Sequence, residues 1–223
     1  MNTKAVIFDF DDTIGNREIY SYTTFCEVLD LKYPDLDPWK REAVVQHMMV
    51  YDQNGEVGRD YVRERILGKF GIDIGEDIQQ YWIQHQWRNT AVYDDTDLVL
   101  HELKNRGYRL GILTNGTVEG QSGKVEKSGI ADLLDAVVIS GATPYKKPDP
   151  EIFLLTAEKM HMNPRECAYV GDMFLNDMYG AHCAGMRPIW YWPHGFRKVS
   201  VEIERIQCLS DLLDLFPKLE REE

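Results

Sequence analysis

AVIFDFDDTI, residues 5–14, is the stretch that decides the fold of this chain. Four apolar residues run without interruption and are followed at once by carboxylates. An unbroken apolar run predicts a strand that is buried on both faces, as in a parallel sheet covered by helices. The carboxylates then fall at the C-terminal end of that strand, where open α/β sheets place their ligand sites.

The carboxylates Asp9, Asp11 and Asp12 have two interpretations. Clustered carboxylates repel each other and are costly to desolvate unless positive charge lies among them. A hard divalent cation with oxygen ligands, such as Mg²⁺, meets that need. The alternative is a solvated turn, in which Asp11 and Asp12 cap the next helix. This strand end alone favours the turn, and the remaining motifs decide for the cation.

The composition limits the classes of protein. The chain has 223 residues, of which 43% are hydrophobic and 28% charged, as in a soluble protein with one core or a core and a smaller inserted domain. A net charge of −12 argues against a nucleic-acid polymer or an anionic membrane as a partner. No signal peptide or membrane span is recognisable, and the four scattered cysteines predict reduced thiols. The sequence therefore predicts a cytoplasmic protein.

Residues 16–91 predict an all-helical insertion. Apolar residues recur at helical spacing over 18–29, 38–51, 58–70 and 76–88, with prolines and glycines at the breaks. We expect residues 16–91 to form a separate helical domain. The core would then consist of residues 1–15 and 92–223.

From Val92 onwards, predicted helices and strands alternate. Strands are expected over 108–113, 136–139, 168–171 and 188–192, and helices over 96–106, 118–128, 148–160, 175–184 and 211–216. The first helix would be capped from within Asp94 to Thr96 and the last by Ser210. This alternation predicts an α/β class, with a Rossmann-like parallel sheet that has helices on both faces. In the aromatic run after the last strand, His194 has no partner in the sequence that would make it a ligand or a base.

The second strand ends in Thr114-Asn115-Gly116-Thr117. The Thr114 hydroxyl is suited to hold a phosphate oxygen, and Gly116 lets the following backbone amides approach an anion. Taken alone, the same residues also form a plausible plain turn.

Two further segments carry charge near predicted strand ends. Lys146 and Lys147 precede a Pro-x-Pro helix start, and one of them can balance the carboxylates; the alternative is a solvated loop. Asp172 follows the fourth strand, and Asp177 follows at the start of the next helix, where the helix dipole alone also favours an acid. Together these segments place acids, a hydroxyl and a lysine on one edge of one sheet.

At this point the chain resembles the haloacid dehalogenase-like hydrolase superfamily. AVIFDFDDTIGN resembles its first motif, D-x-D-x-T; LTNGT resembles the second; KKPDPEIF the third; and VGDMFLNDMYGAHCAGM the fourth, G-D-x-x-x-x-D. The resemblance covers residues 1–15 and about 92–216. The helical insertion resembles the C1-type cap domain of that family in position and helicity.

The resemblance implies roles for the first two acids and for the metal. Asp9 would be the nucleophile that forms an aspartyl-phosphate, and Asp11 would be the acid and base. Mg²⁺ would be held by Asp9, by Asp172 and by the backbone carbonyl of Asp11. The second acid of the first motif favours phosphoryl transfer over dehalogenation, and Asp12 stands where glycine is common.

The resemblance also implies how the substrate is held. Thr114 would bind the phosphoryl group, and Lys147 would be the family lysine that Asp177 orients. Asn115 and Gly116 are candidate substrate-binding residues beside Thr114. Specificity would come from the cap, where Arg17, Tyr20 and Arg59 are candidates; Arg59 would hold a second anionic group, or alternatively be a solvated helix residue.

The predicted activity is Mg²⁺-dependent hydrolysis of a small-molecule phosphate monoester by a monomer or weak homodimer. The alternatives are a phosphomutase acting on a sugar phosphate and an inactive family member that serves as an interaction protein. A response-regulator receiver would place its acid pair and its phosphorylated aspartate on different strands. Here Asp9 and Asp11 share one strand end, which disfavours a receiver.

Overall fold

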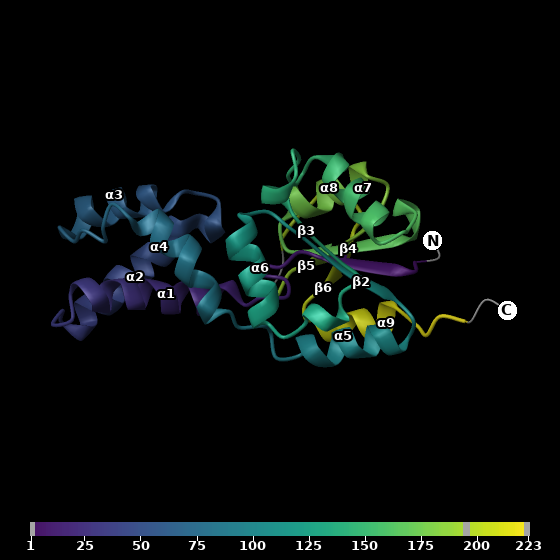
Figure 1. The fold of residues 1–223 in the computed structure, drawn as a ribbon, viewed down its shortest axis with the longest axis horizontal. Coiled ribbons are helices and arrows are strands. Elements are labelled where there is room, and N and C mark those ends of the chain that lie inside the picture. The colour runs from purple at the N-terminus through teal and green to yellow at the C-terminus, as the bar shows by residue number, and fades with distance from the viewer. Residues whose placement is uncertain (1–2, 194–196, 221–223) are drawn as a thin grey trace. The chain divides into compact units, whose positions relative to one another are not determined.

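The computed structural model describes residues 3–193 and 197–220, so the prediction for His194 lies outside the described residues. The chain divides into two compact units, one formed by residues 1–15 and 92–223 and the other by residues 16–91. Each unit is described by itself (Figure 1). The assignment of the second unit as a cap domain stays a prediction.

The first unit is built on one parallel sheet, as predicted. In the described part of the chain six strands follow the order β3-β2-β1-β4-β5-β6, and every neighbouring pair is parallel. The strands are β1 (Ala5–Phe8), β2 (Arg109–Thr114), β3 (Ala136–Ile139), β4 (Cys167–Gly171), β5 (Arg187–Tyr191) and β6 (Glu204–Ile206). Strand β1 therefore lies between β2 and β4, at the reversal of strand order where such sheets bind ligands.

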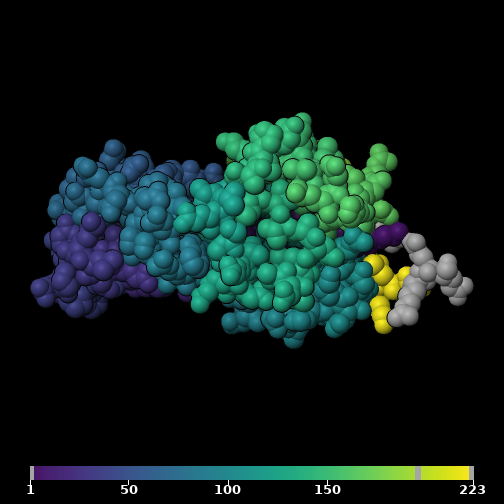
Figure 2. Space-filling view, in the orientation of Figure 1, coloured from purple at the N-terminus to yellow at the C-terminus, as the bar shows by residue number. Residues whose placement is uncertain are grey.

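Helices cover both faces of this sheet. Val6 and Phe8 of β1 pack into one apolar cluster, and Ala5 and Ile7 into another, because successive side chains of a strand point to opposite faces. Helices α5 (Thr96–Asn105) and α9 (Leu212–Leu215) contribute to the first cluster, and α7 (Pro150–Lys159) and α8 (Tyr179–Cys183) to the second (Figure 1). Later segments also cover most of β1 in the space-filling view (Figure 2). An apolar run without alternation is what a strand buried on both faces requires.

The structure of the first unit differs from the prediction in three places. Strand β6 was not predicted, because its three residues include two charged side chains and offer almost no apolar pattern. The helix expected over 175–184 begins as a π-helical turn, Phe174–Met178, before α8. Asp95 is the N-cap residue of α5, within the predicted range, but its side chain does not cap that helix: its Oδ2 accepts from the amide and hydroxyl of Ser210. The cap predicted at Ser210 is wrong, because Ser210 lies within a 3₁₀ turn, Leu209–Asp211, and Asp211 is the N-cap of α9.

The turn after β1 is held by backbone hydrogen bonds. The amides of Ile14 and Gly15 both donate to the Phe10 carbonyl, at 3.0 and 2.7 Å. Asp12 has a φ of +57°, in the left-handed region where glycine is favoured and aspartate is better tolerated than most other residues. Aspartate is therefore tolerated at this position of the turn.

The second unit is helical and has its own core. Its helices are α1 (Arg17–Lys32), α2 (Pro38–Asp52), α3 (Arg59–Phe70) and α4 (Ile78–His85), followed by a 3₁₀ turn, Gln86–Asn89. The Phe25 and Trp82 rings pack against each other in this core at a tilt of 39°, with ring centroids 4.6 Å apart. The Asn16 side chain accepts the Ile19 amide and caps α1. No helix in the described part of either unit is long and apolar enough to cross a membrane.

Candidate active site

The parallel sheet brings side chains from distant parts of the sequence to one edge. Asp9 follows β1, Thr114 ends β2, and Asp172 follows β4; these three strands are neighbours. The Asp9 amide donates to the Val170 carbonyl at 2.9 Å, which continues the ladder one residue beyond β1. The polar groups therefore gather where the carboxyl ends of the central strands meet.

Lys147 lies inside the carboxylate cluster. Its ammonium is 2.7 Å from Asp9 Oδ1 and 2.6 Å from Asp177 Oδ1, and it donates to the Tyr169 hydroxyl at 3.1 Å. A lysine ammonium has three donors, so these contacts use all of them. Lys147 is 4% exposed and Asp177 is fully buried. Lys147 therefore lies where its charge offsets that of the carboxylates, as expected for one of the two lysines.

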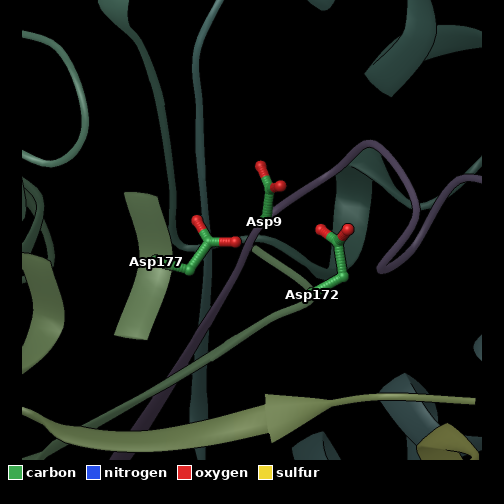
Figure 3. A group of neighbouring side chains, drawn as sticks. All are labelled: Asp9, Asp172 and Asp177. Carbon is green, nitrogen blue, oxygen red and sulfur yellow. The ribbon is translucent and has the colours of Figure 1, made fainter. Parts of the chain in front are cut away.

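Three carboxylates share this region. Single carboxylate oxygens of Asp9, Asp172 and Asp177 all lie within 4.8 Å of one another, and Figure 3 shows the three side chains arriving from three segments. Oxygen donors of this kind, close together and mostly buried, suit a hard divalent cation. The group can therefore hold a metal ion. The Asp11 side chain is not a member of this group, and the expected contribution of its backbone carbonyl stays a prediction.

Burial shifts the pKa values of this cluster. Burial raises the pKa of Asp9 from 3.8 to about 7, although Lys147 acts in the opposite direction. Burial, followed by the charges of Asp177 and Asp9, raises the pKa of Asp172 well above its ordinary value. For Lys147 burial lowers the pKa, but Asp177 and Asp9 together raise it above the ordinary lysine value. One ammonium therefore does not neutralise three carboxylates, and the site attracts further positive charge.

This excess of negative charge predicts that the metal-free protein loses stability as the pH rises. The pKa of Asp9 is about 7 in the folded protein, so the folded state keeps a proton that the unfolded chain releases above 3.8. The stabilisation of the folded state by this proton is complete below about pH 4 and is lost as the pH rises through about 7. The raised pKa of Lys147 adds no slope here, because that group is protonated in both states. One such group changes the free energy of unfolding by at most about 1.4 kcal/mol per pH unit.

Denaturant unfolding in EDTA between pH 4.5 and 7 would measure this slope. Asp9→Asn should reduce the slope and leave the part that comes from Asp172, whose pKa is also raised, whereas Asp132→Asn, which changes an exposed aspartate of the same unit, should leave the slope unchanged. An equal slope in the Asp9→Asn protein would show that Asp9 is not the group that holds the proton.

The loop after β2 supports Lys147. The Asn115 Oδ1 accepts the Lys147 amide at 2.9 Å, and its Nδ2 donates to the Lys147 carbonyl at 3.0 Å. The Gly116 amide donates to Ser140 Oγ at 3.0 Å. The Asn115 side chain and the Gly116 amide thus have hydrogen-bond partners within the protein. The substrate-binding role of Asn115 and Gly116 stays a prediction. Thr114 itself is 1% exposed at the end of β2.

The turn after β4 positions Asp177. Its Oδ2 accepts the Met173 amide at 2.9 Å, while Oδ1 is held by Lys147. A Cβ at Gly171 would lie 2.5 Å from the Asp177 carboxyl carbon, so only glycine lets strand and carboxylate approach this closely. The orientation of Lys147 by Asp177 stays a prediction, which these contacts support.

Sequence reasoning missed three side chains of the first unit. Tyr169 of β4 lies 3.0 Å from the Leu113 carbonyl and 3.2 Å from Asp177 Oδ1 through its hydroxyl. Gln121 and Lys124 of α6 (Val118–Lys127) both contact the Asp11 carboxylate. Tyr169 was hidden in an apolar strand pattern, and the two α6 residues looked like part of a polar helix surface.

Arg59 lies within the second unit and is buried. It forms an ion pair with Asp52, which also pairs with Arg17 at 2.5 Å, and its guanidinium stacks 4.7 Å from the Trp82 ring. Burial, followed by the charge of Arg17, lowers the pKa of Arg59 to about 9. The alternative of a solvated helix residue is therefore wrong. Binding of a second anionic group by Arg59 stays a prediction.

Comparisons with known proteins agree with this architecture. The family model of haloacid dehalogenase-like hydrolases matches residues 6–191. A phosphoserine phosphatase of Thermus thermophilus is 33% identical over 58% of this chain, and the chain spans about half of that relative, 51%. A glyceraldehyde 3-phosphate phosphatase of Methanothermobacter thermautotrophicus is 30% identical over 83% of this chain and 84% of its own.

The solved structures include the HAD-hydrolase YfnB of Bacillus subtilis bound to magnesium. It is 20% identical and covers 97% of this chain and 99% of its own, with a TM-score of 0.80, which shows a shared fold. Three features together define a class of hydrolases. They are a parallel α/β core, a helical unit inserted after the first strand, and four segments with acids, a hydroxyl and a lysine at one sheet edge. This chain belongs to the haloacid dehalogenase-like hydrolase family.

Proposed function

We propose that this protein is a phosphatase that hydrolyses a small-molecule phosphate monoester through an aspartyl-phosphate on Asp9. Family membership supports the proposal, and relatives named as phosphatases favour phosphate esters as substrates. The observation that carries it is the buried Asp9 carboxylate with the Lys147 ammonium 2.7 Å away at the edge of the sheet. A carboxylate in this setting can act as a nucleophile while the lysine balances charge.

The first half of the reaction transfers the phosphoryl group to the protein. An Asp9 carboxylate oxygen attacks phosphorus, and the bond from phosphorus to the ester oxygen breaks. The Asp11 carboxyl gives its proton to that oxygen, so the alcohol leaves neutral. Thr114 holds a phosphoryl oxygen through its hydroxyl, and Lys147 balances the charge on the others.

The second half regenerates the protein. A water molecule attacks phosphorus while the Asp11 carboxylate takes its proton, and the bond between phosphorus and Asp9 breaks. Inorganic phosphate leaves, Asp9 is ionised again, and Asp11 carries the proton with which it began. Two neighbouring carboxylates with different proton affinities thus supply both a nucleophile and an acid.

The donor set fits Mg²⁺. The carboxylates of Asp9 and Asp172, with the backbone carbonyl of Asp11, would hold the ion; Asp177 is already engaged with Lys147 and the Met173 amide. When bound, Mg²⁺ neutralises negative charge on the phosphoryl oxygens. Asp177 would act by orienting Lys147.

Phosphate release from an aryl phosphate tests this proposal. We expect turnover with Mg²⁺, a loss of about a hundredfold or more in excess EDTA, and recovery when Mg²⁺ is restored, because without the cation the carboxylates repel the anionic substrate. Turnover that is undiminished in EDTA would contradict the metal role.

A substrate screen would then follow, beginning with phosphoserine and glyceraldehyde 3-phosphate, the compounds named for two relatives. Incubation with sugar monophosphates separates two outcomes. Free phosphate supports a phosphatase, whereas an isomeric sugar phosphate would show a phosphomutase. Location in the cytoplasm and a monomeric or weakly dimeric state stay predictions.

A further inference from the structure

The Asp11 carboxylate is held by two side chains from one helix. Lys124 Nζ lies 2.6 Å from Asp11 Oδ1, and Gln121 Nε2 donates to Asp11 Oδ2 at 2.8 Å. The two residues are three positions apart on α6, so they share a face of that helix. Both oxygens of one carboxylate are therefore engaged by side chains more than 100 residues away in sequence.

Burial of the Lys124 and Gln121 side chains costs free energy of folding unless their polar groups find partners. Lys124 is 2% exposed and Gln121 is 5% exposed, whereas Lys127 on the same helix is exposed. A lysine is rarely buried unless its charge is paired. The Gln121 Oε1 is buried and accepts no hydrogen bond within the described residues, which costs stability. The structure thus buries these two side chains where their hydrogen-bond donors reach the Asp11 carboxylate.

We infer that Lys124 and Gln121 are positioning residues that hold the Asp11 carboxylate for its proton transfers. The inference rests on the proposed function, in which Asp11 is the acid and base. Neither α6 residue need touch the substrate; each acts through Asp11.

The geometry supports this role in two ways. Gln121 Nε2 also donates to the Asn115 carbonyl at 3.0 Å, so both of its amide protons are used and its rotamer is fixed. Through Gln121, the loop that follows Thr114 and the carboxylate of Asp11 are held by the same side chain. A carboxylate oxygen has more than one lone pair, so an oxygen that accepts from Gln121 can still take a proton from water.

Lys124→Met tests the inference, because methionine keeps the buried unbranched stem and removes the ammonium. A catalytic group displaced by about 1 Å can lose on the order of a hundredfold in rate, so we expect kcat to fall about tenfold to a hundredfold. With an alkyl phosphate, for which transfer to Asp9 is the slow step, KM should change by less than about threefold, because a residue that acts only in proton transfer leaves binding unchanged. The loss should be larger for an alkyl phosphate, whose leaving group needs a proton, than for an aryl phosphate.

A double-mutant cycle identifies the partner through which Lys124 acts. Kcat on the aryl phosphate is measured for wild type, Lys124→Met, Asp11→Asn and the double variant. If Lys124 acts through Asp11, the Lys124→Met loss should nearly disappear in the Asp11→Asn background. Lys124→Arg should restore part of the activity. Lys127→Met is the matched control on the same helix and should leave kcat unchanged, and thermal melts confirm that each variant is folded.

The outcomes separate this inference from the proposed function. A severe loss in Asp11→Asn with wild-type kcat in Lys124→Met overturns the inference and leaves the proposed function intact. Additive losses, or a raised KM with unchanged kcat, also overturn it, because Lys124 would then act elsewhere or bind substrate. Wild-type activity in Asp11→Asn would remove the proposed role of Asp11 and the inference with it. A loss confined to kcat that is absent in the Asp11→Asn background supports it.

Discussion

Asp9→Asn should yield a folded protein without measurable phosphate release. Asparagine keeps the volume of aspartate, and Lys147 retains its 2.6 Å contact with Asp177, so the buried ammonium stays paired. The amide has no anionic oxygen to attack phosphorus, so neither half of the reaction can occur. Removal of a covalent nucleophile typically costs on the order of 10⁴-fold or more.

Mass spectrometry and ligand binding give independent readouts for Asp9→Asn. After an acid quench, wild type should carry a phosphoryl mass on the peptide around Asp9, and the variant should not. Beryllium fluoride with Mg²⁺, which mimics an aspartyl-phosphate, should raise the melting temperature of wild type because it binds the native state. An equal rise in Asp9→Asn, or a phosphorylated peptide elsewhere, would contradict the assignment of the nucleophile. Asp132→Asn is the control for a surface aspartate.

Asp11→Asn should separate the two halves of the reaction. The variant keeps the nucleophile but loses the proton donor and the base, and such catalysis is typically worth on the order of 10²–10⁴-fold. With an alkyl phosphate both steps should be severely slowed. With an aryl phosphate, whose leaving group needs little protonation, the first step should partly recover while the second still lacks a base.

Phospho-enzyme should therefore accumulate on Asp9 when Asp11→Asn is given an aryl phosphate. A quench at increasing times, followed by mass analysis of the peptide around Asp9, measures this accumulation. Wild-type turnover of both the alkyl and the aryl substrate would show that Asp11 is only a turn residue. The buried Lys124 loses its anionic partner in this variant, so a melting curve should accompany the kinetics.

The position of the candidate active site at one sheet edge was predictable because it depends on strand ends. In a parallel sheet every strand points the same way, so acids and hydroxyls that follow apolar runs must meet at one edge. Asp9, Thr114 and Asp172 follow this rule, and the structure places them after β1, at the end of β2 and after β4. The residues alone left Lys146 and Lys147 as candidates to balance the carboxylates, with a solvated loop as the alternative, since a lysine in a loop is usually solvated. The family motif selected Lys147.

Several contacts required the tertiary structure. In the sequence, Tyr169 stands within the five-residue apolar pattern of β4 and gives no sign of a polar role. In the structure, its hydroxyl contacts Lys147 and Asp177. β6 and the π-helical turn have too few residues to show a period in the sequence.

The sequence by itself determined the α/β core, the place of the helical insertion and the order of the four motifs. These properties follow from local patterns, because an apolar run, a glycine or a capping aspartate acts on its neighbours in the chain. The tertiary structure alone decided that Lys124 and Gln121 face Asp11 across more than 100 residues of sequence. Helical spacing shows that two side chains share a face, but not which distant carboxylate that face meets; the packing of α6 beside the turn after β1 decides it.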